Sequence, residues 1–503
     1  MRETLGEVYL VGCGPGDPEL ITVKGLRLLK GADTIIHDRL INFRILDFTK
    51  PNAELIDVGK SSKSTGYHQD EINQMMVGKA KLGKKVIRLK GGDPFLFGRG
   101  GEESEFLRKH NIPFQVVPGV TSAIAAPAYA GIPVTHRSIA SSVTFVSGNE
   151  DINKANSNIN WHAISNTGGT IVVLMSRNKL NMITGQLIKV GLNPDTPAAL
   201  IRWGSEPHQT TITGTITNIS LQADVANLLP PVALVIGNVV NLRNKLNWFE
   251  NLPLFGKRVL VTRTRNQSSK LSGLLAQQGA IPIELPAIKI IPINIKALHY
   301  QLREINKFSW IVFTSSNAVH IFFEELHNTG FDSRNLSGIE IAAIGSVTKS
   351  SLEKYGIKNV VMPETFNTKS LGDLLIKEVF KDQNILLPRS ELGHNEFVAK
   401  LKSAGIQVQE INIYKTVIPK RSKKLATEIF KEGIDIATFT STSTVNGLVD
   451  LLGEINQLRN VNIACIGPVT EASIKMTGLT PNIIASESTV ESLVEAIKTH
   501  FTR

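Results

Sequence analysis

The sequence predicts an α/β protein with two halves, the second of which is internally duplicated. Along its 503 residues, short runs rich in Val and Ile alternate with helical patterns, which is typical of helices layered on mostly parallel sheets. The segment LNWFENLPLFGKRVLVTR, residues 246–263, reads as a helix end, a short linker at about 251–255 and a new strand. Beyond this linker, three sequence blocks occur twice in the same order.

The composition predicts a cytoplasmic protein without a metal centre. A hydrophobic fraction of 42% is ordinary for a soluble protein, no apolar run has the length of a membrane helix, and the first residues lack the apolar core of a signal peptide. Cys13 and Cys465 lie far apart, within or beside apolar runs. They indicate neither a disulfide nor a cysteine metal site, and they fit a reducing compartment.

The net charge of +11 favours a polyanionic small substrate over nucleic acid. The lysines are scattered, no basic helix stands out, and aromatic residues make up only 6% of the chain. Domains that stack on nucleic-acid bases or read their edges need more clustered basic residues and more aromatic residues. An ordinary solvated surface is the alternative reading of the charge.

The first distinctive motif is VYLVGCGPGDPEL, residues 8–20, in which an apolar strand enters a glycine loop. Asp17 and Pro18 predict a helix start, and Gly31 predicts its end. A dinucleotide fingerprint would read G-x-G-x-x-G, but here the third glycine comes one residue early, and the Lys-Ser/Thr of a P-loop is missing. This loop alone is compatible with a nucleotide site and with a structural turn.

Two more loops favour a ligand. KGGDPFLFGRGGEE, residues 90–103, contains two glycines that allow close backbone approach and an Asp that can accept from a ribose hydroxyl or an ammonium group. VVPGVTSA, residues 116–123, leads to Thr and Ser at an expected helix start. Because each loop follows a β-like run, the three are expected to meet at one sheet edge and to hold an adenosyl ligand by backbone groups.

With HDRL at 37–40, VGK at 58–60, GIPVTHR at 131–137 and LNWF at 246–249, these motifs make residues 5–250 resemble the tetrapyrrole methylase family. The resemblance is greatest to the uroporphyrinogen-III C-methyltransferases, which use S-adenosyl-methionine and release S-adenosyl-homocysteine. It implies two α/β lobes, at about 1–135 and 136–250, with the cofactor between them, and a homodimer formed through this half. The first glycine loop is then not a dinucleotide fingerprint. The positions that match the family's cofactor pocket are Pro15, Gly91, Gly92, Asp93, Leu96, Thr121, Ser122, Met175 and Gly204.

The resemblance also implies catalytic groups. Asp38 in HDRL matches the family's proposed base, and Lys60 in VGK matches a proposed proton donor. The alternative interpretation is that Asp38 is an ordinary surface carboxylate and Lys60 an ordinary surface amine. The segment GKSSKSTGYHQDEIN departs from the family pattern because His68 directly precedes Gln69, so no role for a loop histidine is carried over.

The repeated blocks predict a ligand cleft in the second half. KRVLVTR (257–263) matches QNILLPR (383–389), WIVFTSSNAV (310–319) matches IATFTSTSTV (436–445), and IAAIGSVT (341–348) matches IACIGPVT (463–470). Hydroxyls and backbone N–H groups at helix starts bind carboxylates, and arginines pair with them. Taken one at a time, each of these hydroxyl groups is equally typical of an ordinary helix cap that binds no ligand. The candidates are Arg263, Thr314, Ser315, Ser316, Thr348, Arg389, Thr440, Ser441, Thr442 and Thr470.

Residues 254–503 resemble uroporphyrinogen-III synthase. The resemblance implies two lobes joined by crossing strands, one from about 254–288 plus 416–503 and the other from about 289–415. It implies cyclisation of hydroxymethylbilane with inversion of ring D and without a cofactor. Tyr414 matches the family's active-site tyrosine, and its counterpart in the repeat is Ile288. The alternative is a buried strand tyrosine.

Two other functions stay open at this point. The first half could be a precorrin methylase that acts later in the corrin pathway, although HDRL, VGK and the complete glycine motif favour the earlier enzyme. The second half could be a non-catalytic binding module that regulates the first. The sequence does not distinguish siroheme from cobalamin as the end product.

Overall fold

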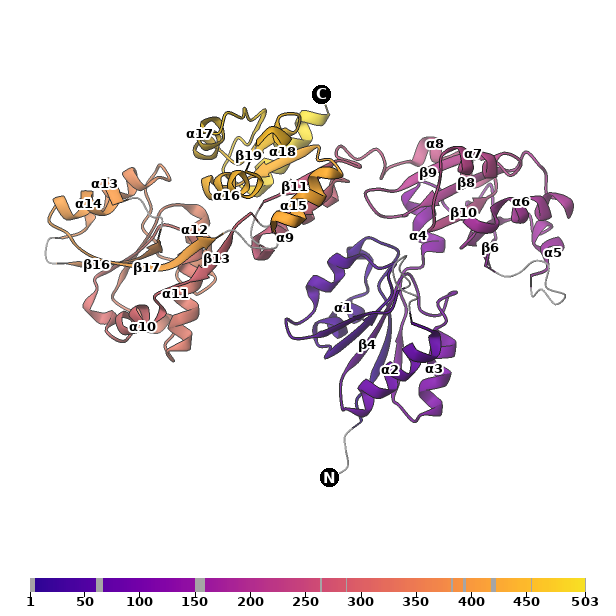
Figure 1. Ribbon diagram of the computed structural model, residues 1–503, viewed down its shortest axis with the longest axis horizontal. Helices are drawn as coiled ribbons and strands as arrows, with labels where there is room; N and C mark the ends of the chain where they lie inside the picture. Colours follow the sequence, from indigo (N-terminus) through magenta and orange to yellow (C-terminus); the bar gives the residue numbers. More distant parts are fainter. Residues whose placement is uncertain are drawn as a thin grey trace. The chain divides into compact units, whose positions relative to one another are not determined.

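The structure, a computed structural model, divides the chain into two compact units (Figure 1). One unit contains Met1–Lys257 and Ala276–Ile281, and the other contains Arg258–Leu275 and Pro282–Arg503. The structure describes residues 5–59, 67–149, 159–262, 265–285, 287–380, 383–391, 395–417, 422–453 and 455–502. Within these ranges, no helix is both long enough and apolar enough to cross a membrane.

The first lobe of the first unit is a parallel sheet with helices on both faces. Its strands follow the order β3-β2-β4-β1-β5. They are β1 (Val8–Gly12), β2 (Thr34–His37), β3 (Glu54–Asp57), β4 (Val86–Lys90) and β5 (Phe114–Val117). Helix α1 (Val23–Lys30) packs on one face, and α2 (Gln69–Lys81) and α3 (Gly100–Lys109) pack on the other. Because both faces are covered, every residue of β1 and β4 is buried.

The first helix starts later than predicted. Asp17 caps only a single 3-10 turn, Pro18–Leu20, and Ile21 then returns to an extended conformation. Helix α1 begins at Val23, after the Thr22 hydroxyl has accepted a hydrogen bond from a backbone N–H in the first turn. Asp17 as a cap and Pro18 as a first helical residue are therefore confirmed for the 3-10 turn, but the longer helix expected to start there begins only at Val23. The end predicted at Gly31 is confirmed.

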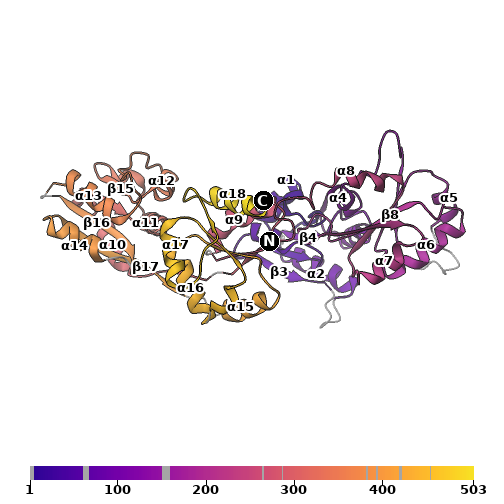
Figure 2. The ribbon, with the colours of Figure 1, turned by 90° about the horizontal axis from the view of Figure 1, so that it is seen from above.

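The second lobe carries a mixed sheet with the order β6-β7-β10-β8-β9. Its strands are β6 (Val143–Ser147), β7 (Thr170–Leu174), β8 (Pro197–Arg202), β9 (Thr210–Thr215) and β10 (Val232–Ile236). Its helices are α4 (Ser122–Tyr129), α5 (Trp161–Ser165), α6 (Leu180–Lys189), α7 (Ile219–Val225) and α8 (Arg243–Leu246). Figure 2 shows α4 on one side of the sheet and α6 and α7 on the other.

This sheet is less parallel than the alternating pattern predicted. The pairs β7–β10, β10–β8 and β8–β9 are antiparallel, and only β6–β7 is parallel. The loop between β8 and β9 is too short for a crossover, so the chain must turn back on itself. The three remaining sheets are wholly or mainly parallel in the pairs that the structure describes.

The second unit contains two sheets, ordered β12-β11-β18-β19-β20 and β13-β17-β16-β14-β15. The strands are β11 (Arg258–Val261), β12 (Ile281–Glu284), β13 (Lys289–Pro292), β14 (Trp310–Phe313), β15 (Glu340–Ala343), β16 (Asn384–Ser390), β17 (Gln407–Val417), β18 (Ile436–Phe439), β19 (Asn462–Cys465) and β20 (Ile483–Ile484). The helices are α9 (Arg265–Gln277), α10 (Ile295–Arg303), α11 (Ser316–Asn328), α12 (Ser346–Glu353), α13 (Thr368–Glu378), α14 (Asn395–Ser403), α15 (Ser422–Lys431), α16 (Thr442–Leu452), α17 (Pro468–Met476) and α18 (Val490–Phe501).

The two copies of the repeat exchange their first strands. In the first sheet, β11 from the first copy pairs with β18 from the second copy, and β19 follows. In the second sheet, β16 from the second copy pairs with β14 from the first copy, and β15 follows. Each sheet is therefore built from both copies, so a sequence copy is not a structural lobe.

Candidate functional site

Three glycine loops lie against one another at the carboxyl edge of the first sheet. Gly14 and Gly92 form an antiparallel bridge, in which the Gly92 N–H donates to the Gly14 carbonyl oxygen at 2.6 Å. A β-carbon on Gly12 would lie 2.5 Å from the carbonyl oxygen of Gly92, and one on Gly119 would lie 2.2 Å from the same atom. Only glycine lets these backbones approach so closely. The structure thus brings together the loops that follow β1, β4 and β5.

Asp93 ties two of these loops together. Its Oδ1 accepts hydrogen bonds from the backbone N–H groups of Phe95 at 2.8 Å and Leu96 at 3.0 Å. Its Oδ2 accepts from the Gly119 N–H at 3.0 Å. Charge-assisted hydrogen bonds of this kind are stronger than neutral ones. The carboxylate thus fixes the loops, and only its remaining lone pairs are available to the ribose or ammonium group expected from the sequence.

Four of the other predicted cofactor residues lie at or beside helix α4, namely Leu96, Thr121, Ser122 and Gly204. Thr121 caps this helix by accepting from the Ala123 N–H at 3.2 Å, which confirms the predicted helix start. Leu96 packs against the core cluster that contains Ala126, and a β-carbon on Gly204 would lie 2.3 Å from the Ala126 β-carbon. Pro15, Gly91 and Ser122 are partly exposed at the same edge.

Met175 stands out by its backbone conformation. It follows β7 directly, its side chain is 48% exposed, and its φ is +57°. Trp203 and Ser205, on either side of Gly204, also have positive φ values, of +50° and +71°. Such residues are uncommon and cluster at binding and catalytic sites. Backbone strain thus marks the second-lobe side of the expected pocket.

Polar groups join the first glycine loop to the second lobe. The Asp17 N–H donates to Ser205 Oγ at 3.1 Å, and the Tyr129 hydroxyl donates to Asp17 Oδ2 at 2.8 Å. The Glu206 side chain lies beside Gly16, where a β-carbon would be 2.5 Å from the Glu206 Cγ. Burial, followed by the charge of Asp17, raises the pKa of Glu206 to about 7. No motif in the sequence marks this cluster, so it was not predicted.

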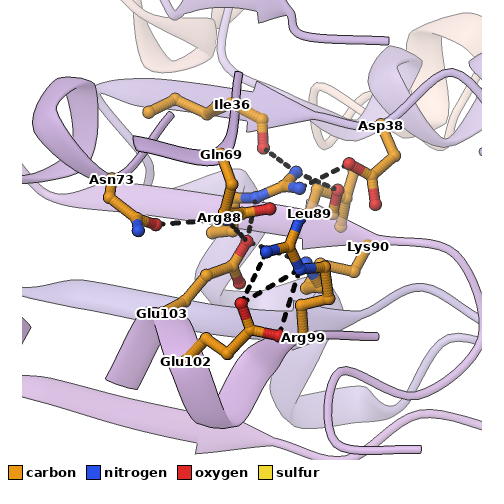
Figure 3. Close-up of polar contacts among 10 residues, drawn as sticks. All are labelled: Ile36, Asp38, Gln69, Asn73, Arg88, Leu89, Lys90, Arg99, Glu102 and Glu103. Atoms are coloured by element: carbon orange, nitrogen blue, oxygen red, sulfur yellow. Dashed lines mark hydrogen bonds and ion pairs between the residues drawn. The ribbon is translucent and has the colours of Figure 1, made fainter. Parts of the chain in front are cut away.

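Asp38 is held by a buried arginine (Figure 3). Arg88 Nη2 donates to Asp38 Oδ1 at 2.5 Å, and Arg88 Nε donates to Glu103 Oε1 at 3.0 Å. Burial acts to lower the pKa of Arg88, but the carboxylates of Asp38 and Glu103 outweigh it and raise that pKa. The Asp38 side chain is 34% exposed, and its Oδ2 has no hydrogen-bond partner among the described residues. Among the described residues, Arg88 thus binds Asp38 through one carboxylate oxygen only.

Lys90 and Gln69 complete the network around Glu103. Lys90 Nζ lies 2.9 Å and Gln69 Nε2 lies 3.1 Å from Glu103 Oε1. Burial, followed by the charge of Arg88, lowers the pKa of Lys90. This network around Glu103 was not predicted from the sequence. The sequence feature from which it could have been predicted is VIRLK. This buried strand places two cations on one face and therefore requires a buried carboxylate nearby.

The groups at this edge fit an adenosyl cofactor. The glycine loops offer backbone donors and acceptors, and Thr121 and Ser122 add hydroxyl groups. The exposed thioether of Met175 offers a polarisable apolar surface of the kind that packs against aromatic rings. Lys60, the predicted proton donor, lies outside the described residues.

In the second unit, Tyr414 and Ser315 form a hydrogen-bonded pair. The Tyr414 hydroxyl lies 2.9 Å from Ser315 Oγ, and Tyr414 is 6% exposed. Ser315 also caps α11 by accepting from the Ala318 N–H, and Ser441 caps α16 in the same way. Both predicted helix starts are confirmed. Ile288, the counterpart of Tyr414 in the repeat, is also buried, where it packs against Gly447.

The remaining carboxylate-binding candidates differ in exposure. Thr314, Ser316 and Thr440 are partly exposed, and Thr442 is exposed at the start of α16. Thr348 and Thr470 are each only 4% exposed, in the first turns of α12 and α17. Arg389 is buried, and its Nη1 donates to Glu410 Oε2 at 2.9 Å, so its carboxylate partner here lies within the same sheet. Arg263 lies outside the described residues.

Two family models match the chain. The model of tetrapyrrole (corrin/porphyrin) methylases matches residues 7–220, and the model of uroporphyrinogen-III synthase HemD matches residues 269–495. Porphyrin biosynthesis protein HemD of Ruminiclostridium josui is 37% identical over 494 residues, which cover 98% of this chain and 97% of that protein. Uroporphyrinogen-III C-methyltransferase of Bacillus subtilis is 39% identical over 363 residues, or 72% of this chain and 74% of that protein.

Among solved structures, uroporphyrin-III C-methyltransferase from Thermus thermophilus, complexed with S-adenyl homocysteine, is 36% identical. It matches 47% of this chain and 94% of its own, with a TM-score of 0.41. The sequence similarity to the Ruminiclostridium josui protein extends over both units, in the order that the two family models require. The chain therefore belongs to the family of tetrapyrrole-biosynthesis proteins that join a tetrapyrrole methylase and a uroporphyrinogen-III synthase in one polypeptide.

Proposed function

We propose that the second unit cyclises hydroxymethylbilane to uroporphyrinogen III with inversion of ring D, and that the first unit methylates this product twice to give precorrin-2. The observation that carries the methylation is the meeting of the three glycine loops and Asp38 at one edge of the parallel sheet. The full-length similarity to a porphyrin biosynthesis protein supports both activities in one chain.

S-adenosyl-methionine is the proposed methyl donor, and its sulfonium makes the methyl group electrophilic. Relatives named as S-adenosyl-L-methionine-dependent methyltransferases support this choice. The glycine loops and Asp93 would hold the ribose and the amino-acid part, and Leu96, Met175 and Gly204 would line the adenine side. Excluding water and aligning the methyl group with a pyrrole carbon would supply most of the rate.

Asp38 is the proposed base. After a pyrrole carbon has gained a methyl group, the ring carries a positive charge, and the macrocycle must lose a proton from a neighbouring position to become neutral. The Oδ2 atom of Asp38 would take that proton while Arg88 holds Oδ1 in place. The homodimer expected from the resemblance stays a prediction, which analytical ultracentrifugation would test.

The test is to supply the purified protein with hydroxymethylbilane and S-adenosyl-methionine and to identify the products. Formation of uroporphyrinogen III and then of a dimethylated product is expected. Asp38→Asn should retain cofactor binding and slow methylation by about a hundredfold. Methylation without cyclisation would favour the binding-module alternative for the second unit. An unmethylated uroporphyrinogen III together with methylation of a later precorrin would favour the other alternative.

A further inference from the structure

An irregularity in β17 turns Tyr414 toward the start of α11. Residues 407–412 of β17 pair one to one with β16, but Ser390 then pairs with Tyr414 instead of Ile413. Ile413 is thus one extra residue on β17, which is the definition of a β-bulge.

The bulge decides which face Tyr414 occupies. Ile411 and Ile413 belong to the core cluster beneath α11, whereas Val408 packs in the cluster on the opposite face. Regular alternation would place Tyr414 on the face of Val408. It instead belongs to the cluster of Ile411 and Ile413, where its hydroxyl meets Ser315. Bulges that re-aim a side chain are frequent next to active sites.

The hydrogen-bonding capacity of this pair leaves one proton unused. A serine hydroxyl has one donor proton and two acceptor positions, and the Ser315 oxygen already accepts from the Ala318 N–H at 3.2 Å. If Tyr414 donates to Ser315, both acceptor positions are filled and the Ser315 proton is left. If Ser315 donates instead, the Tyr414 proton is left. In either arrangement, the described residues leave the pair with one free hydroxyl donor.

Exposure decides which hydroxyl presents this donor. Tyr414 is 6% exposed and its ring is packed in the core, whereas Ser315 is partly exposed at the end of β14. A substrate therefore meets the serine before the phenol. We infer that Ser315 and Tyr414 act as one dyad, in which Tyr414 donates to Ser315 and Ser315 donates to the departing hydroxyl of hydroxymethylbilane. This inference rests on the synthase activity proposed above.

The step is balanced without an external acid. The C–O bond of the hydroxymethyl group breaks and its electron pair leaves with the oxygen, which the Ser315 O–H stabilises by a hydrogen bond. The resulting cation forms a C–C bond with ring D at the α-carbon that already carries the methylene bridge to ring C. The older bond at that carbon then breaks, and the released methylene cation bonds to the free α-carbon of ring D, which gives the type III isomer. The proton released as the rings regain aromaticity converts the departing hydroxide into water.

The test measures the cyclisation rate and the ratio of inverted to uninverted product in the full chain, with hydroxymethylbilane alone. Ser315→Gly removes the hydroxyl but leaves a residue that is tolerated at a helix cap. We expect Ser315→Gly and Tyr414→Phe each to slow cyclisation by about a hundredfold, because each removes one of the two hydroxyl groups that together donate the hydrogen bond to the leaving group. Both should also release more uninverted isomer. The double variant should be no slower than either single variant, because the two groups act as a unit.

Two further variants separate a chemical role from a structural one. Ser315→Thr keeps the hydroxyl and should cyclise at nearly the rate of the unmodified protein. Asn367→Ala removes the cap of α13, where the Asn367 side chain accepts from the Ser370 N–H at 2.8 Å, and should not change the isomer ratio.

Normal cyclisation by Ser315→Gly, beside a defective Tyr414→Phe, would overturn the dyad and leave Tyr414 to act alone. Normal cyclisation by both would remove the pair from the mechanism. A failure of the unmodified protein to cyclise hydroxymethylbilane would instead overturn the proposed function, and the dyad with it.

Discussion

Replacing Glu206 by Gln should change how the stability of the first unit depends on pH. In the folded protein the pKa of Glu206 is raised from 4.5 to about 7, first by burial and then by Asp17, against a smaller opposing effect of Arg44. Between pH 4.5 and about 7, the folded state therefore holds a proton that the unfolded chain has released. The free energy of unfolding must fall as the pH rises through this window.

The size of this effect follows from the two pKa values. Each pKa unit corresponds to 1.36 kcal/mol, so the difference between a pKa of 4.5 and one of about 7 corresponds to about 3 kcal/mol of unfolding free energy. Most of it, about 2.5 kcal/mol, develops between pH 5 and pH 8. Glu206→Gln is neutral throughout, so it should lack this decline and be the more stable protein at pH 8.

Urea unfolding followed by pulsed hydrogen exchange reports each unit separately, which a single unfolding transition of a two-unit chain does not. Peptides that cover β8 and β9 report the region around Glu206. As a control, Glu102→Gln removes an exposed carboxyl group whose pKa is lowered by Arg99, so any change in pH dependence should have the opposite sign. Parallel pH curves for Glu206→Gln and the unmodified protein would show that Glu206 is not a buried, protonated group.

Three other predictions concern the same sites. Asp93→Ala leaves three backbone N–H groups without their acceptor, so S-adenosyl-methionine should bind more weakly by about 1–3 kcal/mol in calorimetry; unchanged affinity would contradict the role of the loops. Arg88→Lys cannot serve Asp38 and Glu103 together, and breaking this buried pairing should lower the free energy of unfolding by about 3 kcal/mol, measured by urea titration; a change below the error would contradict the network. Fragments 1–250 and 254–503 should methylate supplied uroporphyrinogen III and cyclise hydroxymethylbilane, respectively; if neither fragment folds, a domain boundary at about residues 251–255 is wrong.

The sequence was sufficient wherever local chemistry and strand order decide the structure. The glycine loops were expected to meet because parallel strands place their carboxyl ends at one edge, and Gly12, Gly92 and Gly119 do meet there. Thr121 and Ser315 cap helices because a hydroxyl that follows a strand satisfies the first free N–H groups of the next helix.

The sequence was insufficient wherever a side chain depends on distant partners. Arg88 and Glu103 are fifteen residues apart, and only the packing of α3 against β4 brings them together. The bulge at Ile413 is set by the register of β16 against β17, which strand alternation does not show. Glu206 acquires its raised pKa from burial against a loop of the first lobe, nearly two hundred residues earlier in the chain.

The exchange of first strands between the two repeat copies determines how this half of the chain can be divided. A cut between the copies, near residue 380, would leave β11 on one fragment while β18 and β19, its sheet partners, remain on the other. The same cut would separate β16 from β14 and β15. Neither fragment holds the inner strands of a complete sheet, so the two should recover their fold only by complementing each other. A single ancestral copy of the repeat would meet the same requirement by swapping its first strand with a second, identical chain.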